Sequence, residues 1–344
     1  MIKTAPLLVC LALFFSGCAS VDNFGSSLKY NIQGEYYLQK KKYPQGIEKF
    51  RQAVENDPNN AEAHYYYGRF LLAENKAEKA LPSLKQAAAL SPDKSEYHFW
   101  LGVALGETGQ VRQERLSYRK TLEIDPENIQ ALTYMGNNLL RAGKDKEALE
   151  YYQKTLSLWP SSPQALYNRA VILRKQGRTQ EEKRAWLQYL DAHPAGGFAR
   201  VAADRLNILG DQSYRNHRLG LRTVTLAEID FVSSTGQLSP SAYPSLDLVG
   251  ATVANMVKGT LNIVVYQRNN LTLAKKRAQS IRNYLTQRYP DLNYPDLKTG
   301  KRIRISWFDT AEIRTVLRKK LSHDESVQFF LTDFRESKKS SRKK

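Results

Sequence analysis

Five tandem copies of a 34-residue pattern constrain this 344-residue chain more than any other feature. A small residue, a proline and a large apolar residue each recur at this period. The small residues are Gly34, Gly68, Gly102, Gly136 and Ala170, and the prolines are Pro58, Pro92, Pro126, Pro160 and Pro194. The large residues are Phe50, Leu84, Tyr118, Tyr152 and Trp186. Self-similarity at this period predicts a repeat architecture in which each copy is one supersecondary unit.

The pattern resembles the tetratricopeptide repeat, in which each unit is a pair of antiparallel helices. We therefore expect an all-α solenoid of five helix-turn-helix units over residues 28–196, in which small residues allow close helix approach and large residues fill the space between helices. The end of such an array needs a cap. Residues 197–210 are predicted to form this capping helix, because Phe198, Val201, Leu206 and Leu209 recur at helical spacing before Gly210.

The first residues are typical of an export signal. Lys3 precedes an apolar run from Ala5 to Phe15, which is too short to cross a bilayer. The following Ser-Gly-Cys resembles the lipobox of bacterial lipoproteins. This resemblance implies a signal peptide over residues 1–17, a lipid such as palmitate on Cys18, and a tether over residues 18–27. Ala19 then favours the outer membrane. The alternative is an ordinary secretory signal that leaves a free thiol on Cys18.

Most of the net charge of +18 lies in residues 197–344, which end in a basic tail over residues 336–344. A positive field attracts polyanions of any kind. An exported chain would meet anionic lipid, lipopolysaccharide or cell-wall polymer, so we do not expect nucleic acid as a partner. The tail either binds such a surface or is a solvated, disordered segment.

After a linker over residues 211–221, strand and helix patterns alternate. The predicted strands are 224–232, 261–266, 303–308 and 327–331, and the predicted helices are 243–258, 271–289 and 311–321. This order predicts a small α/β sandwich over residues 222–335, with one sheet covered by helices.

Two segments of this region resemble the OmpA-like, peptidoglycan-associated domain: the strand from Leu261 to Val265 and the helix start from Asn270 to Ala278. The resemblance implies that Arg277 binds a carboxylate of diaminopimelate in the wall peptide. The Asp that would hold the amino group is missing from the loop after the strand, which leaves Asn269 or Asn270 for that role. Two interpretations stay open: a working peptidoglycan binder, or a degenerate OmpA-like module kept for docking.

The concave surface of a repeat array can bind an extended segment of a partner protein. From the repeat register we predict a partner-binding groove on the first helices of the units, lined by Tyr65, Arg69, Phe99, Val103, Asn137, Tyr167 and Arg174. Tyr, Phe and Arg often dominate interface energies. The alternative is that the aromatic residues pack against neighbouring helices.

No catalytic, metal-binding or cofactor-binding motif stands out in the sequence. His64 and His98 are 34 residues apart, so we expect equivalent stacking roles between repeats. We predict a non-catalytic lipoprotein on the periplasmic face of the outer membrane. It would act as an adaptor that binds a periplasmic protein through the groove and docks to cell wall or a second partner through the OmpA-like domain. The alternatives are a peptidoglycan-binding structural tether and an accessory factor of a cell-wall enzyme.

Overall fold

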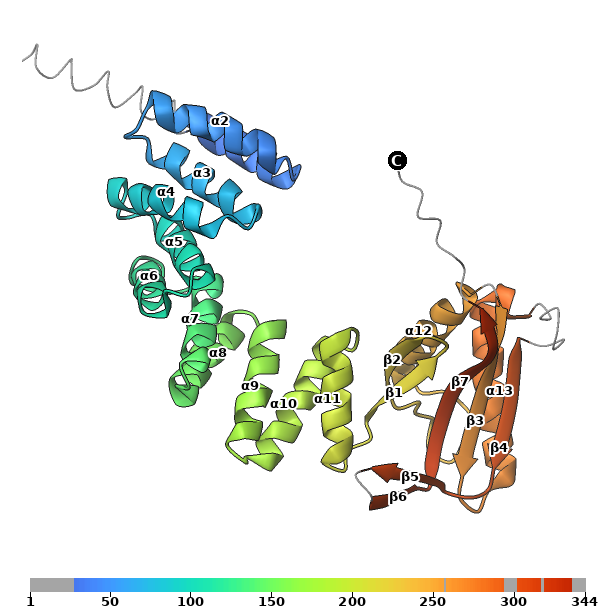
Figure 1. Cartoon of the computed structure of the whole chain (residues 1–344). Helices are drawn as coiled ribbons and strands as arrows, with labels where there is room; N and C mark the ends of the chain where they lie inside the picture. The colour runs from blue at the N-terminus through green and yellow to red at the C-terminus, as the bar shows by residue number, and fades with distance from the viewer. Residues whose placement is uncertain (1–27, 257, 294–301, 317–318, 336–344) are drawn as a thin grey trace, which may run out of the picture. The chain divides into compact units, whose positions relative to one another are not determined.

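The structure is a computed structural model that describes residues 28–256, 258–293, 302–316 and 319–335. The expected signal peptide, Cys18, the tether and the basic tail lie outside these residues. The chain divides into two compact units, one ending at Pro160 and the other beginning at Ser161 (Figure 1).

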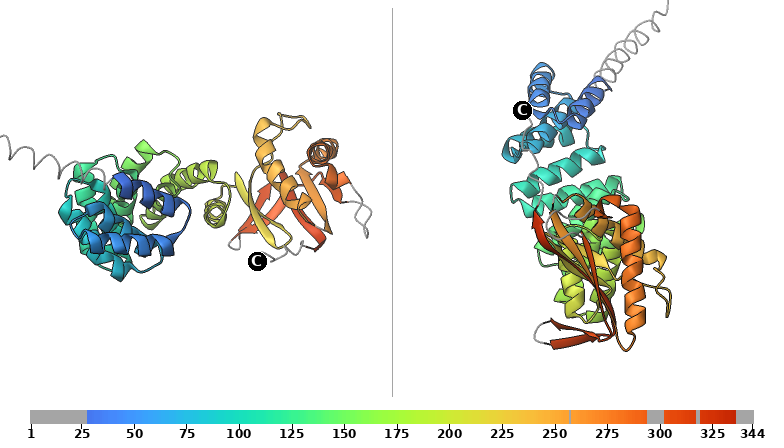
Figure 2. Two further views of the ribbon diagram at one scale, coloured as in Figure 1. Left: turned by 90° about the horizontal axis from the view of Figure 1, so that it is seen from above. Right: turned by 90° about the vertical axis from the view of Figure 1, so that its right-hand side faces the viewer.

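The first unit consists of helices arranged as consecutive antiparallel pairs. Residues 28–39 are helical and pair with α2 (Tyr43–Asn56). The next pairs are α3 (Ala61–Ala73) with α4 (Ala77–Leu90), α5 (Ser95–Glu107) with α6 (Val111–Ile124), and α7 (Ile129–Arg141) with α8 (Asp145–Leu158). Neighbouring pairs pack side by side, as both views of Figure 2 show.

The repeated small residue is required by the close approach of the two helices in a unit. A Cβ atom on Gly102 would lie 2.5 Å from the ring of Tyr118, and one on Gly136 would lie 2.7 Å from the ring of Tyr152. Both tyrosines are fully buried. Because close-packed interiors cannot absorb such an overlap without a shift, the small and large positions of each repeat are coupled.

The two equivalent histidines bind the loops that precede their helices. His64 Nε2 lies 2.9 Å from the carbonyl oxygen of Pro58, and His98 Nε2 lies 3.0 Å from that of Pro92. The expected equivalence is therefore confirmed. Each imidazole contacts the loop that connects its repeat to the preceding one, and the expected stacking role between repeats stays a prediction.

The second unit begins with the fifth helical pair, α9 (Pro163–Lys175) and α10 (Thr179–Ala192), followed by α11 (Gly197–Ile208). The predicted capping helix is thus present. The strands and helices that follow are β1 (Tyr214–Leu219), β2 (Arg222–Ala227), α12 (Tyr243–Ala254), β3 (Lys258–Gln267), α13 (Leu271–Arg288), β4 (Ile303–Phe308), β5 (Glu312–Val316), β6 (Lys319–His323) and β7 (Glu325–Arg335), with short 3-10 helices η1 (Pro240–Ala242) and η2 (Pro290–Asn293). The predicted fold class, a helical repeat solenoid followed by a small strand-containing region, is confirmed.

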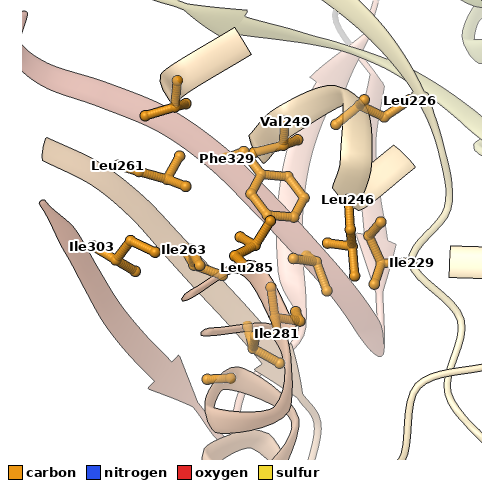
Figure 3. Close-up of a cluster of buried hydrophobic side chains, with 14 of the residues drawn as sticks. Leu226, Ile229, Leu246, Val249, Leu261, Ile263, Ile281, Leu285, Ile303 and Phe329 are labelled. Atoms are coloured by element: carbon orange, nitrogen blue, oxygen red, sulfur yellow. The ribbon is translucent and has the colours of Figure 1, made fainter. Parts of the chain in front are cut away.

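The central sheet has the strand order β4-β3-β7, with β3 parallel to β4 and antiparallel to β7. α12 and α13 cover one face of this sheet, and their side chains meet those of the strands in a single apolar core (Figure 3). Leu246 from α12, Ile281 from α13 and Ile263 from β3 are fully buried there. The layer of helices on this sheet is as predicted. The expectation of a single sheet is corrected, because the described strands form three sheets, with β1-β2 and β5-β6 as separate two-stranded sheets.

The structure corrects the predicted linker over residues 211–221. Residues 214–219 form β1, which pairs with β2 through a tight turn at Gly220, where φ is +69°. The strand-containing region therefore starts at Tyr214 and not at residue 222. The sequence pattern did not indicate this strand, because the inward-facing residues of β1 include the polar Arg215 and His217.

The structure also corrects the predicted helix over residues 311–321. Residues 312–316 and 319–323 instead form the antiparallel pair of strands β5 and β6. Their apolar spacing fits a helix, yet Glu312 is buried while Ile313 is 69% exposed. The apolar spacing predicted a helix wrongly because the carboxylate of Glu312, rather than the apolar side chain of Ile313, faces inward.

Candidate partner-binding groove

The first unit carries a hollow of about 490 Å³. Its walls come from the helix over residues 28–39 and from α2 to α5. The lining residues are Leu38, Tyr43, Arg69, Leu72, Ala73, Asn75, Ala77, Glu78, Trp100, Val103 and Glu107. The lining is mixed, with apolar side chains beside the polar Arg69, Asn75, Glu78 and Glu107. A binding pocket combines apolar surface with a few polar groups that fix the orientation of its ligand. We call this space the large hollow.

Arg69 is fixed in the wall of the large hollow by aromatic rings and carboxylates. Its guanidinium carbon lies 4.3 Å from the ring centroid of Trp100 and 5.3 Å from that of Tyr65. Its Nη1 atom is 3.5 Å from a carboxylate oxygen of Glu35 and 3.7 Å from one of Glu96. The positive charge is therefore compensated within the unit, and the side chain is only 17% exposed.

The Tyr65 hydroxyl group links Arg69 and Glu96. It donates to Glu96 and accepts a hydrogen bond of 2.9 Å from Arg69 Nη1. Burial raises the pKa of the Tyr65 phenol, so it remains protonated and available as a donor. The groove wall is thus held by a hydrogen-bonded network that spans adjacent repeats.

A second, small hollow of about 250 Å³ lies further along the first unit. Val103 and Glu107 line both hollows, so the two spaces adjoin. The other lining residues of the small hollow are Gly106, Glu114, Tyr118, Tyr134, Asn137 and Arg141. We use the term groove for the two hollows together.

The small hollow contains a compensated ion pair. Glu114 is buried, and both of its carboxylate oxygens lie 2.6 Å from Arg141 Nη2. Asn138 Nδ2 donates to the same carboxylate at 2.8 Å. A charge-assisted pair of this kind positions the two helices and leaves little net charge at this point.

Three of the sequence-predicted groove residues line the groove. Arg69 and Val103 line the large hollow, and Val103 and Asn137 line the small one. Asn137 also accepts a 2.7 Å hydrogen bond from the Tyr152 hydroxyl group, which orients its amide.

Two predicted groove residues are corrected to core positions. Tyr65 is 1% exposed and Phe99 is 4% exposed. The Phe99 ring packs 5.8 Å from Tyr118 and 5.4 Å from Tyr134, measured between centroids. These rings support the groove and cannot offer a partner much surface.

The remaining two predicted groove residues belong to the second unit. Tyr167 is half-buried, with ring centroids 4.6 Å from Phe198 and 5.3 Å from Trp186. Its ring packs against α10 and α11, and Arg174 is exposed near the end of α9.

Sequence reasoning missed the aromatic residues that do reach the groove. Trp100 is half-buried and Tyr134 is 39% exposed, and both line a hollow. They are 34 residues apart, and Trp100 follows the predicted Phe99 by one residue, so a shift of one position along α5 would have found it. Glu107 and Arg141 form a second series at the same period.

The second unit contains the other predicted site, around Arg277. This side chain is 4% exposed and lies 4.6 Å from the Phe231 ring centroid. Its guanidinium group donates to Gln267, to Glu325 at 2.8 Å and to the carbonyl oxygen of Thr235 at 3.2 Å. The bond from Arg277 lowers the pKa of Glu325, as does the one from Gln267, while partial burial opposes them. Glu325 thus occupies the position that a ligand carboxylate would take.

The two asparagines expected to assist Arg277 have local roles. Asn270 caps α13, since its side chain accepts from the backbone N–H of Leu273 at 2.9 Å. Asn269 has a φ of +59°, and its backbone N–H donates to the Asp309 carbonyl oxygen. The structure therefore brings neither amide into hydrogen bonding with Arg277.

Within the described part of the chain, no group of three or more His, Cys, Asp or Glu side chains could hold a metal ion. None of the helices described is both long enough and apolar enough to cross a membrane.

Comparisons with known proteins identify the repeats. Residues 47–166 match the model of a family described as cytochrome c-type biogenesis protein H TPR domain, and residues 164–195 match one described as tetratricopeptide repeat. No curated protein sequence matches the chain.

Part of the chain is also similar to solved structures of other proteins. The Pseudomonas aeruginosa PilF structure has a TM-score of 0.51 and 20% identity, covering 56% of this chain and 87% of its own. A MamA structure has a TM-score of 0.44 and 20% identity, covering 46% and 93%. YrrB, titled a TPR protein with an unusual peptide-binding site, has a TM-score of 0.45 and 18% identity, covering 52% and 91%.

The helical part of the chain is thus built of tetratricopeptide repeats. Domains of this class are protein–protein interaction scaffolds that are typically non-catalytic. The groove described above lies within this helical repeat part of the chain.

Proposed function

We propose that this protein is a non-catalytic adaptor of the bacterial cell envelope. A lipid on Cys18 anchors it to the periplasmic face of the outer membrane, the groove of the first unit binds a periplasmic protein, and the α/β region docks to the cell wall or to a second partner. The Ser-Gly-Cys sequence after an apolar run supports the anchor. The composition of the groove supports the adaptor role.

The observation that carries the adaptor role is the fixed position of Trp100 in the large hollow. Arg69 stacks on its ring at 4.3 Å and is itself held by two carboxylates and Tyr65. An aromatic residue that is already held in place loses little conformational entropy when a partner binds. Tryptophan in a partly enclosed pocket is also the residue type that most often dominates binding energy.

An interaction experiment tests the adaptor role. The full chain and its Trp100→Ala variant would be purified from membranes and the captured proteins compared by mass spectrometry. The matched control is Trp159→Ala, because Trp159 is 44% exposed but lines neither hollow. We expect the partner to be lost only with Trp100→Ala; equal capture by all three proteins would refute the groove as the binding surface.

Lipidation can be tested on the same protein. Metabolic labelling with palmitate should tag the wild-type chain and not Cys18→Ser, and fractionation should place only the wild type in the outer membrane. An unlabelled wild-type chain would remove the anchor from the proposal and leave the groove unaffected.

The α/β region is proposed as a divergent OmpA-like docking domain. In this region β3 is followed directly by α13, which is the order of the two segments on which the sequence resemblance rests. The buried Arg277 at the ends of β3 and β7 supports a site of the type that this resemblance implies. A wall carboxylate would have to replace Glu325 as the partner of Arg277.

Binding to purified cell-wall sacculi tests this second role with two variants. If the site is functional, Glu325→Gln should strengthen binding because it removes the competing carboxylate, and Arg277→Ala should abolish it. Thermal unfolding of each variant controls for misfolding. Unchanged binding with Glu325→Gln would exclude Arg277 as the wall ligand, and docking to a second protein would remain.

A further inference from the structure

The charged residues that line the groove are not evenly compensated. Arg69 is paired with Glu35 and Glu96, and Arg141 is paired with Glu114. Both cations of the groove therefore already have carboxylate partners within the first unit. An incoming anionic side chain would have to compete with these pairs.

Two carboxylates at the groove remain uncompensated. Glu78 and Glu107 are exposed and line the large hollow, and no cationic side chain of the described residues forms an ion pair with either of them. The groove thus has a local excess of negative charge on a chain whose net charge is +18. Such a contrast favours a partner segment of positive charge.

Apolar side chains line the large hollow together with these carboxylates. Leu38, Leu72, Trp100 and Val103 enclose the large hollow, whose volume of about 490 Å³ is ample for one large side chain with its neighbours. Glu107 lines both hollows, so a residue that pairs with it lies where the two spaces adjoin. The order along the groove is therefore an apolar hollow followed by a carboxylate.

We propose that the groove selects a cationic, amphipathic peptide segment, in which a large apolar side chain enters the large hollow and an adjacent lysine or arginine pairs with Glu107 or Glu78. This inference rests on the proposed adaptor function and specifies the chemistry of its partner. Lysine and arginine fit the site because their aliphatic stems can lie on Trp100 and Val103 while the charged head reaches the carboxylate. An acidic segment is disfavoured by repulsion from the same two carboxylates.

Three labelled peptides of equal length test the proposal by fluorescence anisotropy with the full chain. The first contains leucine or phenylalanine next to lysine, the second replaces lysine by glutamate, and the third replaces the apolar residue by alanine. We expect the first peptide to bind tightest. Glu107→Gln and Glu78→Gln should each weaken it by about 2- to 5-fold, the range of one exposed ion pair.

Control variants separate charge selection from groove binding. Glu150→Gln should have no effect, because Glu150 is an exposed residue of α8 that lines neither hollow. The Gln variants should also leave binding of the glutamate peptide unchanged or strengthened. Added salt should weaken the lysine peptide more in the wild type than in Glu107→Gln.

The outcomes distinguish this inference from the function on which it rests. Trp100-dependent binding that prefers the acidic peptide, or that ignores both Gln substitutions, would overturn the charge inference and leave the groove as the binding surface. Binding that is independent of Trp100, or no binding of any of the three peptides, would overturn both.

Discussion

Two adjacent aromatic residues, Phe99 and Trp100, should respond in opposite ways to replacement by alanine. Phe99 is 4% exposed and packs between Tyr118 and Tyr134, whereas Trp100 is half-buried and faces the large hollow. We therefore expect Phe99→Ala to damage stability and Trp100→Ala to damage binding. The pair is a matched comparison because both residues are in the same turn of α5.

The expected magnitudes follow from burial. Removing a buried phenylalanine ring costs about 3–5 kcal/mol, since transfer and cavity terms add. Removing Trp100 loses its stacking on Arg69, worth about 0.5–2 kcal/mol, and part of its apolar burial. Phe99→Ala should therefore lower the midpoint of thermal unfolding by about 10 °C, and Trp100→Ala by only a few degrees, for a unit of this size.

Far-ultraviolet circular dichroism of the full chain measures both midpoints, and peptide anisotropy measures binding well below them. Because a repeat array is stabilised by nearest-neighbour contacts, the melt of Phe99→Ala is expected to broaden as well as shift. A wild-type midpoint for Phe99→Ala would refute this reasoning and restore Phe99 as a residue that faces the partner.

Three further predictions concern buried groups. Burial, reinforced by Arg314 and Arg215, lowers the pKa of His217 to about 4, so the neutral imidazole is favoured in the folded state. The free energy of unfolding should therefore fall by about 3 kcal/mol as the pH drops from 6.5 to 4. Urea denaturation at several pH values should show a smaller fall for His217→Gln. Glu312→Ala should lower the free energy of unfolding by about 3–5 kcal/mol, because Arg215 is left as an unpaired buried charge. Glu312→Gln should lower it clearly less. Equal free energies of unfolding for the two variants would contradict this. Gly102→Ala should destabilise the first unit by about 1–3 kcal/mol because its Cβ atom would overlap the Tyr118 ring, and a variant that melts above the wild type would show that the ring can move.

The repeats could be predicted in detail because their contacts are local and recur. Gly102 meets Tyr118 sixteen residues later in the chain, and the equivalent pair Gly136 and Tyr152 has the same separation. A constraint that repeats at a fixed spacing is visible in a single sequence. The array of helix pairs and the helix that follows it could therefore be predicted from the sequence.

The groove was only partly predicted, because the face that a helix presents depends on its neighbours. Phe99 and its equivalent Thr133 are buried, and the residues one position later, Trp100 and Tyr134, line the hollows. A rotation of one residue about a helix axis is about 100°, which separates core from surface. Residue types alone could not decide between these two faces, since both carry aromatic residues.

The missed strands have a different cause, namely buried polar groups whose partners are distant in the chain. Arg215 in β1 pairs at 3.0 Å with Glu312 in β5, 97 residues away, and Glu312 also accepts hydrogen bonds from Ser326 and Gln328 in β7. Burial acts to raise the pKa of Glu312, but Ser326 and the guanidinium groups of Arg314 and Arg215 outweigh it and lower the pKa. Read along the sequence, these residues are typical of a loop and of a solvated helix.

The sequence by itself determined that this chain is a helical repeat array followed by a smaller region of alternating strands and helices, because period and apolar pattern are properties of neighbouring residues. Only the tertiary structure decided that Trp100 lines the groove and that Glu325 forms an ion pair with Arg277. It also decided that, among the described residues, no cationic side chain forms an ion pair with Glu78 or Glu107. Each of these depends on which charged or aromatic groups meet across different helices and strands, and such meetings are set by packing.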